Sequence, residues 1–201
     1  MDGRVKISPG NSKMGAIPSV SLPAVVTCRD CDCKKKCYAL RIEKRRKNVA
    51  KAYQNNLGIL RDDPETYWRE VEAHVMMARF FRFHVSGDIP DAQYLHKMVS
   101  VAQRNQHCEI LCFTKKYELV NQFLLTGGSL PRNLHLIFSA WPGTTFSNPF
   151  LLPTAHVRFR DGTTTAAVWA KECAGNCTEC AITDGGCWTL QKGEQVVFNE
   201  H

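Results

Sequence analysis

Three strand-type segments that begin at a regular interval constrain the fold more than any other feature of this sequence. They start near residues 81, 108 and 134, so successive starts lie 27 and 26 residues apart. Amphipathic helical segments over residues 91–105 and 116–125 fill the two intervals. This spacing is typical of βα units, in which parallel strands are joined by right-handed crossover helices. We therefore expect an α/β protein.

Hydrophobic periodicity and turn residues predict further elements on both sides of these units. Strands are expected over residues 5–7, 20–22, 156–159 and 165–170. Helices are expected over residues 38–60, with a basic polar face, and over residues 63–79, where Asp63-Pro64-Glu65 is a good helix start. Residues 1–27 are a loop-rich lead-in that contains a first strand, and residues 173–201 are a cysteine-rich end.

A run of parallel strands in one domain either closes into a barrel or forms an open, doubly wound sheet. Both solutions place function at the carboxyl ends of the strands. Glycine-rich phosphate-binding motifs are absent from the sequence, which disfavours the doubly wound alternative. We predict a single domain over residues 1–201, a small or partial βα barrel of the TIM type, with its cysteine loops at the carboxyl-terminal rim of the strands.

Composition limits the environment and the partners. The chain has 26 Lys and Arg against 19 Asp and Glu, a net charge of +7, which assists binding to a polyanion such as nucleic acid without requiring it. No apolar run approaches the ~20 residues that span a bilayer, and the amino terminus lacks the apolar region of a secretory signal. We expect a cytoplasmic protein with no membrane partner.

The chain has ten cysteines. Since the cytosol keeps thiols reduced, clustered cysteines are better explained as metal or cluster ligands than as disulfides. A disulfide framework remains an alternative, because mature secreted proteins also lack signals. Cys108 and Cys112 lie four residues apart within a predicted strand, so they point to one face and are expected to be core residues.

Four cysteines near the end of the chain form the C-terminal thiol set: Cys173, Cys177, Cys180 and Cys187. Four thiolates in one compact loop can close a tetrahedral zinc site or hold a [4Fe-4S] cluster. Zinc sites usually pair two CxxC knuckles, and only Cys177 and Cys180 have that spacing. Iron–sulfur ligation tolerates uneven spacing better, so a [4Fe-4S] cluster is the preferred prediction, with zinc and a metal-free loop as alternatives.

Four more cysteines, within CRDCDCKKKCYA, form the N-terminal thiol set: Cys28, Cys31, Cys33 and Cys37. They lie between the first strand and the basic helix, so we expect them on the same rim as the C-terminal thiol set. Arg29 and the lysines at 34–36 would lower the pKa of these thiols and offset the charge of a thiolate-bound cluster. The alternative is a zinc knuckle beside a solvated basic turn. Whether the chain binds one cluster or two stays open.

Polar residues after two successive strands are the other candidates. Asp88, in Ser86-Gly87-Asp88, could hold an amine, a metal-bound water or a proton, or could be a turn residue. Lys115 follows the next strand and could bind an anionic ligand, or lie in a solvated loop. Asp88 and Lys115 are therefore the catalytic candidates, and His84 is expected to be a hydrogen-bonded interior residue. Hydrolase motifs are absent.

Several stretches together resemble a phage-encoded family, the gene product 88 family. They are NSKMG, VSLPAVVTC, CKKKCYA, FHVSGDI, LCFTKK and the closing CxxC, CW and VVFNEH, which cover nearly the whole chain. The resemblance implies an iron–sulfur protein with a shortened barrel similar to that of radical S-adenosylmethionine enzymes. For a phage-encoded protein the compartment would be the host cytoplasm.

The radical enzymes place CxxxCxxC after the first strand and leave one iron open for the methionyl group. Here CxxxCxxC follows a late strand, and Cys187 can fill the fourth position, which would close the cluster and suit electron transfer or a structural role. Those enzymes also hold the amino group of S-adenosylmethionine with a Gly-Gly-Glu type motif. Ser86, Gly87 and Asp88 are similar in keeping one glycine and one carboxylate, so they are the cofactor-binding candidates, although the match is partial.

The sequence thus predicts a cluster-binding barrel protein, with redox or radical chemistry at the barrel mouth as a hypothesis. It leaves open whether the chain is an enzyme and which substrate or electron-transfer partner it has. The alternative is a zinc-stabilised nucleic-acid-binding module, motivated by the net charge and by the basic residues of segment 41–51.

Overall fold

The computed structural model describes residues 3–28, 31–183 and 185–200. The strands are β1 (Ile7–Ser8), β2 (Ser19–Val20), β3 (Phe80–Phe83), β4 (Glu109–Thr114), β5 (Leu134–Ala140), β6 (Thr154–Arg158), β7 (Lys171–Glu172) and β8 (Gln195–Asn199). The helices are α1 (Tyr38–Arg45), α2 (Lys47–Asp62), α3 (Pro64–Met76), α4 (Ala92–Arg104), α5 (Tyr117–Leu125) and α6 (Cys177–Ile182), with 3₁₀ turns η1 (Asp32–Lys36) and η2 (Gly186–Trp188).

All eight strands belong to one sheet, in the order β1-β2-β3-β4-β5-β6-β8-β7. Only β1 and β2 pair antiparallel, and every other pair is parallel. The order advances from β2 to β6 without the reversal of a doubly wound sheet. In the described part of the chain β1 and β7 are the two edges and do not pair, so the sheet is open. The prediction of a mixed α/β fold with mainly parallel strands is confirmed.

The predicted βα units are present with small shifts in their ends. Strands β3, β4, β5 and β6 coincide with four predicted strands, and α3, α4 and α5 with three predicted helices. Asp63 and Asp91 start α3 and α4, because each side chain accepts a hydrogen bond from the backbone three residues on, at 3.0 and 2.8 Å.

The single helix predicted over residues 38–60 is two helices in the structure. Arg46 has an extended backbone between α1 and α2 (φ −116°, ψ 90°). Four consecutive basic residues, at 44–47, meet at this break. Lys44 and Lys47 are three residues apart, so in a continuous helix their like charges would face each other and disfavour it slightly.

One predicted strand, over residues 165–170, is wrong. These residues form an irregular loop in which Val168 is fully exposed and Trp169 is 59% exposed. The place beside β6 is taken by β8, which the sequence analysis did not predict. β-Propensity without a partner strand does not make a strand, because ladder hydrogen bonds and packing supply most of its stability.

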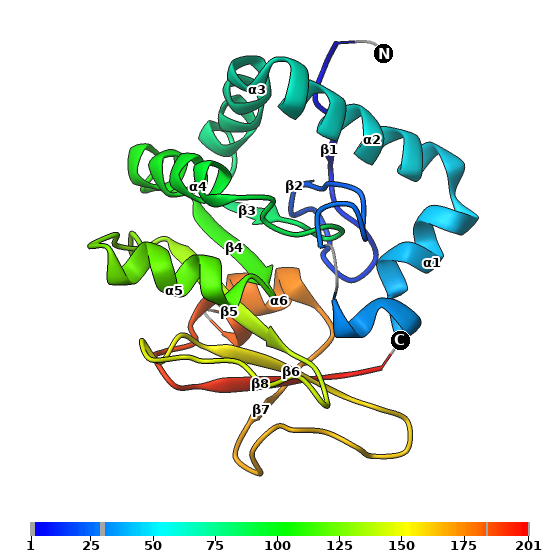
Figure 1. Cartoon of the computed structure of the whole chain (residues 1–201), viewed down its shortest axis with the longest axis vertical. Coiled ribbons are helices and arrows are strands. Elements are labelled where there is room, and N and C mark those ends of the chain that lie inside the picture. Colours follow the sequence, from blue (N-terminus) through cyan, green and yellow to red (C-terminus); the bar gives the residue numbers. More distant parts are fainter. Residues whose placement is uncertain (1–2, 29–30, 184, 201) are drawn as a thin grey trace.

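Alternate residues of the strands pack on two different layers. Phe81 and Phe83 of β3 face the main core with α3, α4 and α5, which lie together along one side of the sheet (Figure 1). Phe80, with Leu111 and Ile137 of the neighbouring strands, faces a second, smaller core that includes Trp188. We call these the helix face and the loop face. The loop face is covered by α6 and η2 rather than by a crossover helix, so the cysteine-rich end packs against the sheet.

Candidate metal centres

The N-terminal thiol set lies where the chain passes from β2 into α1. Cys33, in η1, is buried, and its Sγ is 3.4 Å from the Sγ of Cys31. Cys37 caps α1, since its Sγ accepts a hydrogen bond from the amide of Leu40 at 3.4 Å. Burial, followed by the charge of Asp88, raises the pKa of the Cys28 thiol. The set is therefore next to the carboxyl ends of β3 and β4, as predicted.

The basic group that acts on these thiols is Lys115 and not the run at 34–36. Burial opposes the charge of Lys115, but nearby Cys33 and Asp88 outweigh it and raise the pKa of Lys115, so its ammonium is charged at neutral pH. Its Nζ donates to Ser139 Oγ at 3.1 Å. Lys36 instead contacts Glu200 at 3.6 Å, and Lys34 and Lys35 are exposed. Arg29 lies outside the described residues.

Asp88 is a buried carboxylate that ties the ends of two strands together. Its Oδ1 accepts hydrogen bonds from Thr114 Oγ1 at 2.6 Å and from the amide of Ile89 at 2.8 Å, and its Oδ2 accepts from the amide of Lys115 at 2.9 Å. Burial raises the pKa of Asp88, and these hydrogen bonds oppose the rise. The side chain is already well used inside the protein, so its observed role is a structural tie beside the thiols.

Ser86 and Gly87 join the same strand end to the preceding loop. Ser86 Oγ donates to Glu43 Oε1 at 2.7 Å, and that oxygen also accepts from the amide of Ala24 at 2.8 Å. Gly87 has φ +82°, and a Cβ there would lie 2.7 Å from the carbonyl oxygen of Leu22. Only glycine fits at this position. The roles of Ser86, Gly87 and Asp88 in binding a cofactor, and of Asp88 and Lys115 in catalysis, stay predictions.

The C-terminal thiol set is held by α6, η2 and the loop after β7. The amide of Cys173 donates to the carbonyl of Val197 in β8 at 2.9 Å, and the amide of Cys177 donates to the carbonyl of Lys13 at 2.9 Å. Gly186 has φ +60°, and a Cβ there would lie 2.8 Å from Cys180 Sγ. This glycine lets the backbone pass close to a thiol. Segments that are far apart in the sequence thus fix the loop.

The four thiols of this set are electrostatic neighbours. Burial and then Cys173 raise the pKa of Cys187 to about 12, while Arg82 opposes the rise. Burial raises the pKa of Cys177 and of Cys180, and Cys173 adds to both shifts. Thiols that raise one another's pKa bind a proton at neutral pH unless a cation takes its place. A bound metal would supply that cation.

The structure corrects the position predicted for the C-terminal thiol set. Trp188, next to Cys187, packs on Phe80, the first residue of β3, with ring centroids 5.1 Å apart. The set therefore lies against the loop face and not at the carboxyl-terminal rim, where the N-terminal thiol set lies. The reason is that β7 is short and sits at the sheet edge, so the chain turns back across the sheet after it.

The donor chemistry of the two sets fits a thiophilic metal or an iron–sulfur cluster, because each set brings four soft thiols into one short segment. The cysteine side chains of the described residues are not arranged around a common point. Among residues 3–28, 31–183 and 185–200, no three His, Cys, Asp or Glu side chains are arranged to hold a metal ion. The fit thus rests on residue type and proximity rather than on coordination geometry.

Two residues of the β3 segment were missed as functional candidates or misjudged, Arg82 on the loop face and His84 beside Phe83 and Tyr94 of the main core. Arg82 Nε is buried and has no hydrogen-bond partner among the described residues. His84 is interior, as predicted, but both ring nitrogens lack a partner in the same part of the chain, and its backbone is left-handed (φ +60°). Burial and then Arg82 lower the pKa of His84 to about 3. Alternation along β3 is the sequence signal for Arg82, since it shares a face with Phe80.

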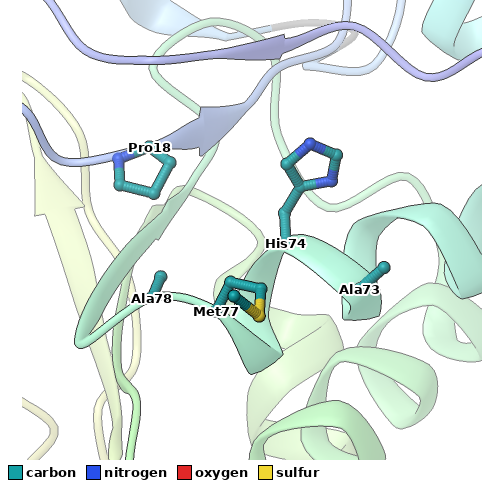
Figure 2. Close-up of a pocket in the computed structure, with 5 residues that line it drawn as sticks. All are labelled: Pro18, Ala73, His74, Met77 and Ala78. Carbon is teal, nitrogen blue, oxygen red and sulfur yellow. The ribbon is translucent and has the colours of Figure 1, made fainter.

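Two other features lie away from the thiols. Cys108 and Cys112 are fully buried in the main core, so their prediction as core residues is confirmed. A hollow of about 320 Å³ is lined by Pro18, which precedes β2, and by residues at the end of α3 and just after it, Ala73, His74, Met77 and Ala78 (Figure 2). It lies at the amino ends of β2 and β3, opposite Asp88.

No helix in the described ranges is long and apolar enough to cross a membrane.

A family model described as Gene product 88 matches residues 4–186. No curated protein and no solved structure matches the chain. The matched range includes every cysteine except Cys187, which comes directly after it.

Proposed function

This chain belongs to the gene product 88 family of phage proteins, and we propose that it binds a [4Fe-4S] cluster through the C-terminal thiol set. The observation that carries the proposal is the packing of four mutually coupled thiols against the loop face of the sheet. A partly buried group of thiols with a guanidinium beside it is an environment that suits a thiolate-bound cluster.

In this proposal the cluster has four protein ligands and supplies one-electron transfer or a structural crosslink. Cys177 and Cys180 project from α6, while Cys173 and Cys187 flank it in sequence. The segment between β7 and η2 already packs against the sheet, so a bound cluster would crosslink it in place. Binding of S-adenosylmethionine at Ser86, Gly87 and Asp88 is a weaker hypothesis, because their polar groups already bond within the protein.

We further propose that the sheet is a partial barrel of the TIM type. The uninterrupted strand order from β2 to β6 and the helices α3, α4 and α5 along one face support this proposal. The cysteine-rich end then occupies the side of the sheet that would be the barrel interior. The N-terminal thiol set occupies the rim, where barrel proteins place their reactive groups.

Anaerobic purification with iron, sulfide and zinc counted per chain tests the cluster proposal. We expect about four irons and four sulfides in the protein, with a brown visible absorbance. Cys180→Ser should lose this iron, whereas Cys108→Ala, which changes a core cysteine, should keep it. A colourless protein with stoichiometric zinc, or iron content that is unchanged in Cys180→Ser, would contradict the proposal.

The same count separates one centre from two. Cys33→Ser changes the N-terminal thiol set alone. If the two sets bind independently, Cys33→Ser and Cys180→Ser each remove part of the metal, and the double variant removes all of it. Complete loss of metal in both single variants would mean that the two sets share one centre.

A second candidate function, nucleic-acid binding by a zinc-stabilised module, is favoured by a basic surface on α1 and α2. Its residues are all exposed: Arg41, Lys44, Arg45, Arg46, Lys47 and Lys51. Such a surface predicts binding to nucleic acid that weakens steeply with salt. A filter-binding titration with single- and double-stranded DNA from about 50 to 200 mM salt tests it. No binding at the lowest salt would exclude this function, and Lys44→Glu with Lys47→Glu is the matched variant if binding is seen.

A further inference from the structure

A buried donor without an acceptor lies beside the C-terminal thiol set. It is Nε of Arg82, in the middle of β3, which has no hydrogen-bond partner among the described residues. Buried N–H groups are almost always paired, and a donor left without an acceptor destabilises a fold. A buried charged donor without an acceptor destabilises a fold more than a neutral one does. The position of Arg82 therefore calls for an acceptor that the described polypeptide does not provide.

The surroundings of Arg82 indicate what that acceptor is. The guanidinium lies over the ring of Phe113, 4.9 Å from its centroid, and its charge acts on the thiols of Cys177 and Cys187. Among the described residues, no carboxylate forms an ion pair with it. Its charge also acts on Tyr38, His84 and the core thiol of Cys112. Of all these groups, the thiols of the C-terminal set are the ones that share the loop face with Phe113 and become anionic when they bind a metal.

The contacts that Arg82 already makes do not satisfy it. The ring of Phe113 attracts the positive charge through its π face, but it is a poor acceptor for the Nε hydrogen. His84 lies two residues away, and it is not an anion. The structure therefore holds a cation whose natural partner is a negatively charged centre built from the neighbouring thiolates.

We propose that Arg82 is the counter-charge and N–H donor of the centre held by Cys173, Cys177, Cys180 and Cys187. This inference rests on the proposed function, and it assigns to the site a residue that is not a ligand. A cluster with four thiolate ligands is an anion, and it becomes more negative on reduction. A guanidinium beside the cluster stabilises the reduced state more than the oxidised state, so it raises the reduction potential.

Three variants of the full chain test the role. Arg82→Met keeps the length of the side chain but removes its charge and donors, and Arg82→Lys keeps the charge but not Nε. Arg79→Met is the matched control, because Arg79 also lies over a phenylalanine ring, that of Phe80 at 5.2 Å, but is exposed. All are purified anaerobically beside the unchanged protein, and thermal unfolding of each metal-free form shows that the variants fold.

Two measurements are made on each protein: the midpoint potential of the centre, and the rate at which a chelator removes its iron. For Arg82→Met we expect a more negative potential and about 10- to 100-fold weaker metal retention, which is typical for loss of a residue that supports metal ligands. Arg82→Lys should lie between Arg82→Met and the unchanged protein. Arg79→Met should match the unchanged protein in both measurements.

The outcomes separate the two levels of the proposal. If the unchanged protein binds metal and Arg82→Met has the same potential and metal retention, the role of Arg82 is overturned while the metal centre stands. If the unchanged protein binds no metal at all, the proposed function fails and the inference fails with it. A lower potential in Arg82→Met that is matched by Arg79→Met would also overturn the inference, because it would reflect net charge alone.

Discussion

The two thiol sets differ in what the fold places around them. The N-terminal thiol set lies at the strand ends, beside an internally bonded carboxylate, Asp88, and a charged lysine, Lys115. The C-terminal thiol set lies against the sheet, beside a guanidinium whose Nε has no partner among the described residues. The polar groups beside the N-terminal thiol set are mostly hydrogen-bonded within the polypeptide. Beside the C-terminal thiol set, Nε of Arg82 lacks an acceptor among the described residues. This difference is the reason why the proposed centre is assigned to the C-terminal thiol set.

The largest loss of stability is expected from a change at Asp88, beside the N-terminal thiol set. Asp88→Ala leaves Thr114 and the amides of Ile89 and Lys115 without their acceptor, so the free energy of unfolding should fall by about 3 kcal/mol or more. Urea unfolding of the metal-free protein measures it. Asp91→Ala, which removes the cap of α4, is the control and should lose about 1 kcal/mol. Equal losses in the two variants would mean that Asp88 is no structural tie.

A smaller loss of stability is expected from a change at Gly87, which also lies beside the N-terminal thiol set. Gly87→Ala places a Cβ against the carbonyl of Leu22, in addition to about 1–2 kcal/mol of strain from the left-handed backbone. Gly127→Ala is the control, since Gly127 has φ +91° and open space around it. Urea unfolding should show a clearly larger loss for Gly87→Ala, and a result in the opposite order would contradict the packing at this strand end.

At the C-terminal thiol set, Gly186→Ala should lower the metal content of the protein more than its stability. The strain is about 1–2 kcal/mol, but the new methyl group displaces Cys180 Sγ, which lies 2.8 Å from its position. Metal analysis should show less bound metal per chain than in Gly175→Ala, whose glycine has φ +81° and no close neighbour. If both variants keep full metal content, Cys180 is not a ligand of the centre.

The smallest loss of stability is expected at Lys36, which lies beside the N-terminal thiol set in η1 and contacts residues of the C-terminal part of the chain. Lys36 lies 3.8 Å above the ring of Phe159 and 3.6 Å from a carboxylate oxygen of Glu200. Because the lysine is half-exposed, Lys36→Met should lower stability by less than about 1 kcal/mol. Lys35→Met, at an exposed neighbour, is the control for urea unfolding. A loss of several kcal/mol would show that the two regions stabilise each other and are not independent.

The amino-acid sequence by itself determined the repeating βα units, the starts of α3 and α4 and the two groups of cysteines. These features depend on local periodicity, capping and spacing, which neighbouring residues decide among themselves. The same local rules placed a strand at residues 165–170, where no partner strand is available. They also missed β8, whose strand character depends on the free edge of β6.

Only the tertiary structure decided that the sheet is open and that the C-terminal thiol set packs across its loop face. It also decided which charges act on each set, Lys115 on one and Arg82 on the other, rather than the lysines that lie nearest in the sequence. The physical reason is that burial, the pairing of donors and the electrostatic environment of a thiol depend on residues brought together from distant segments. Spacing along the chain identified the thiols, and packing identified their neighbours.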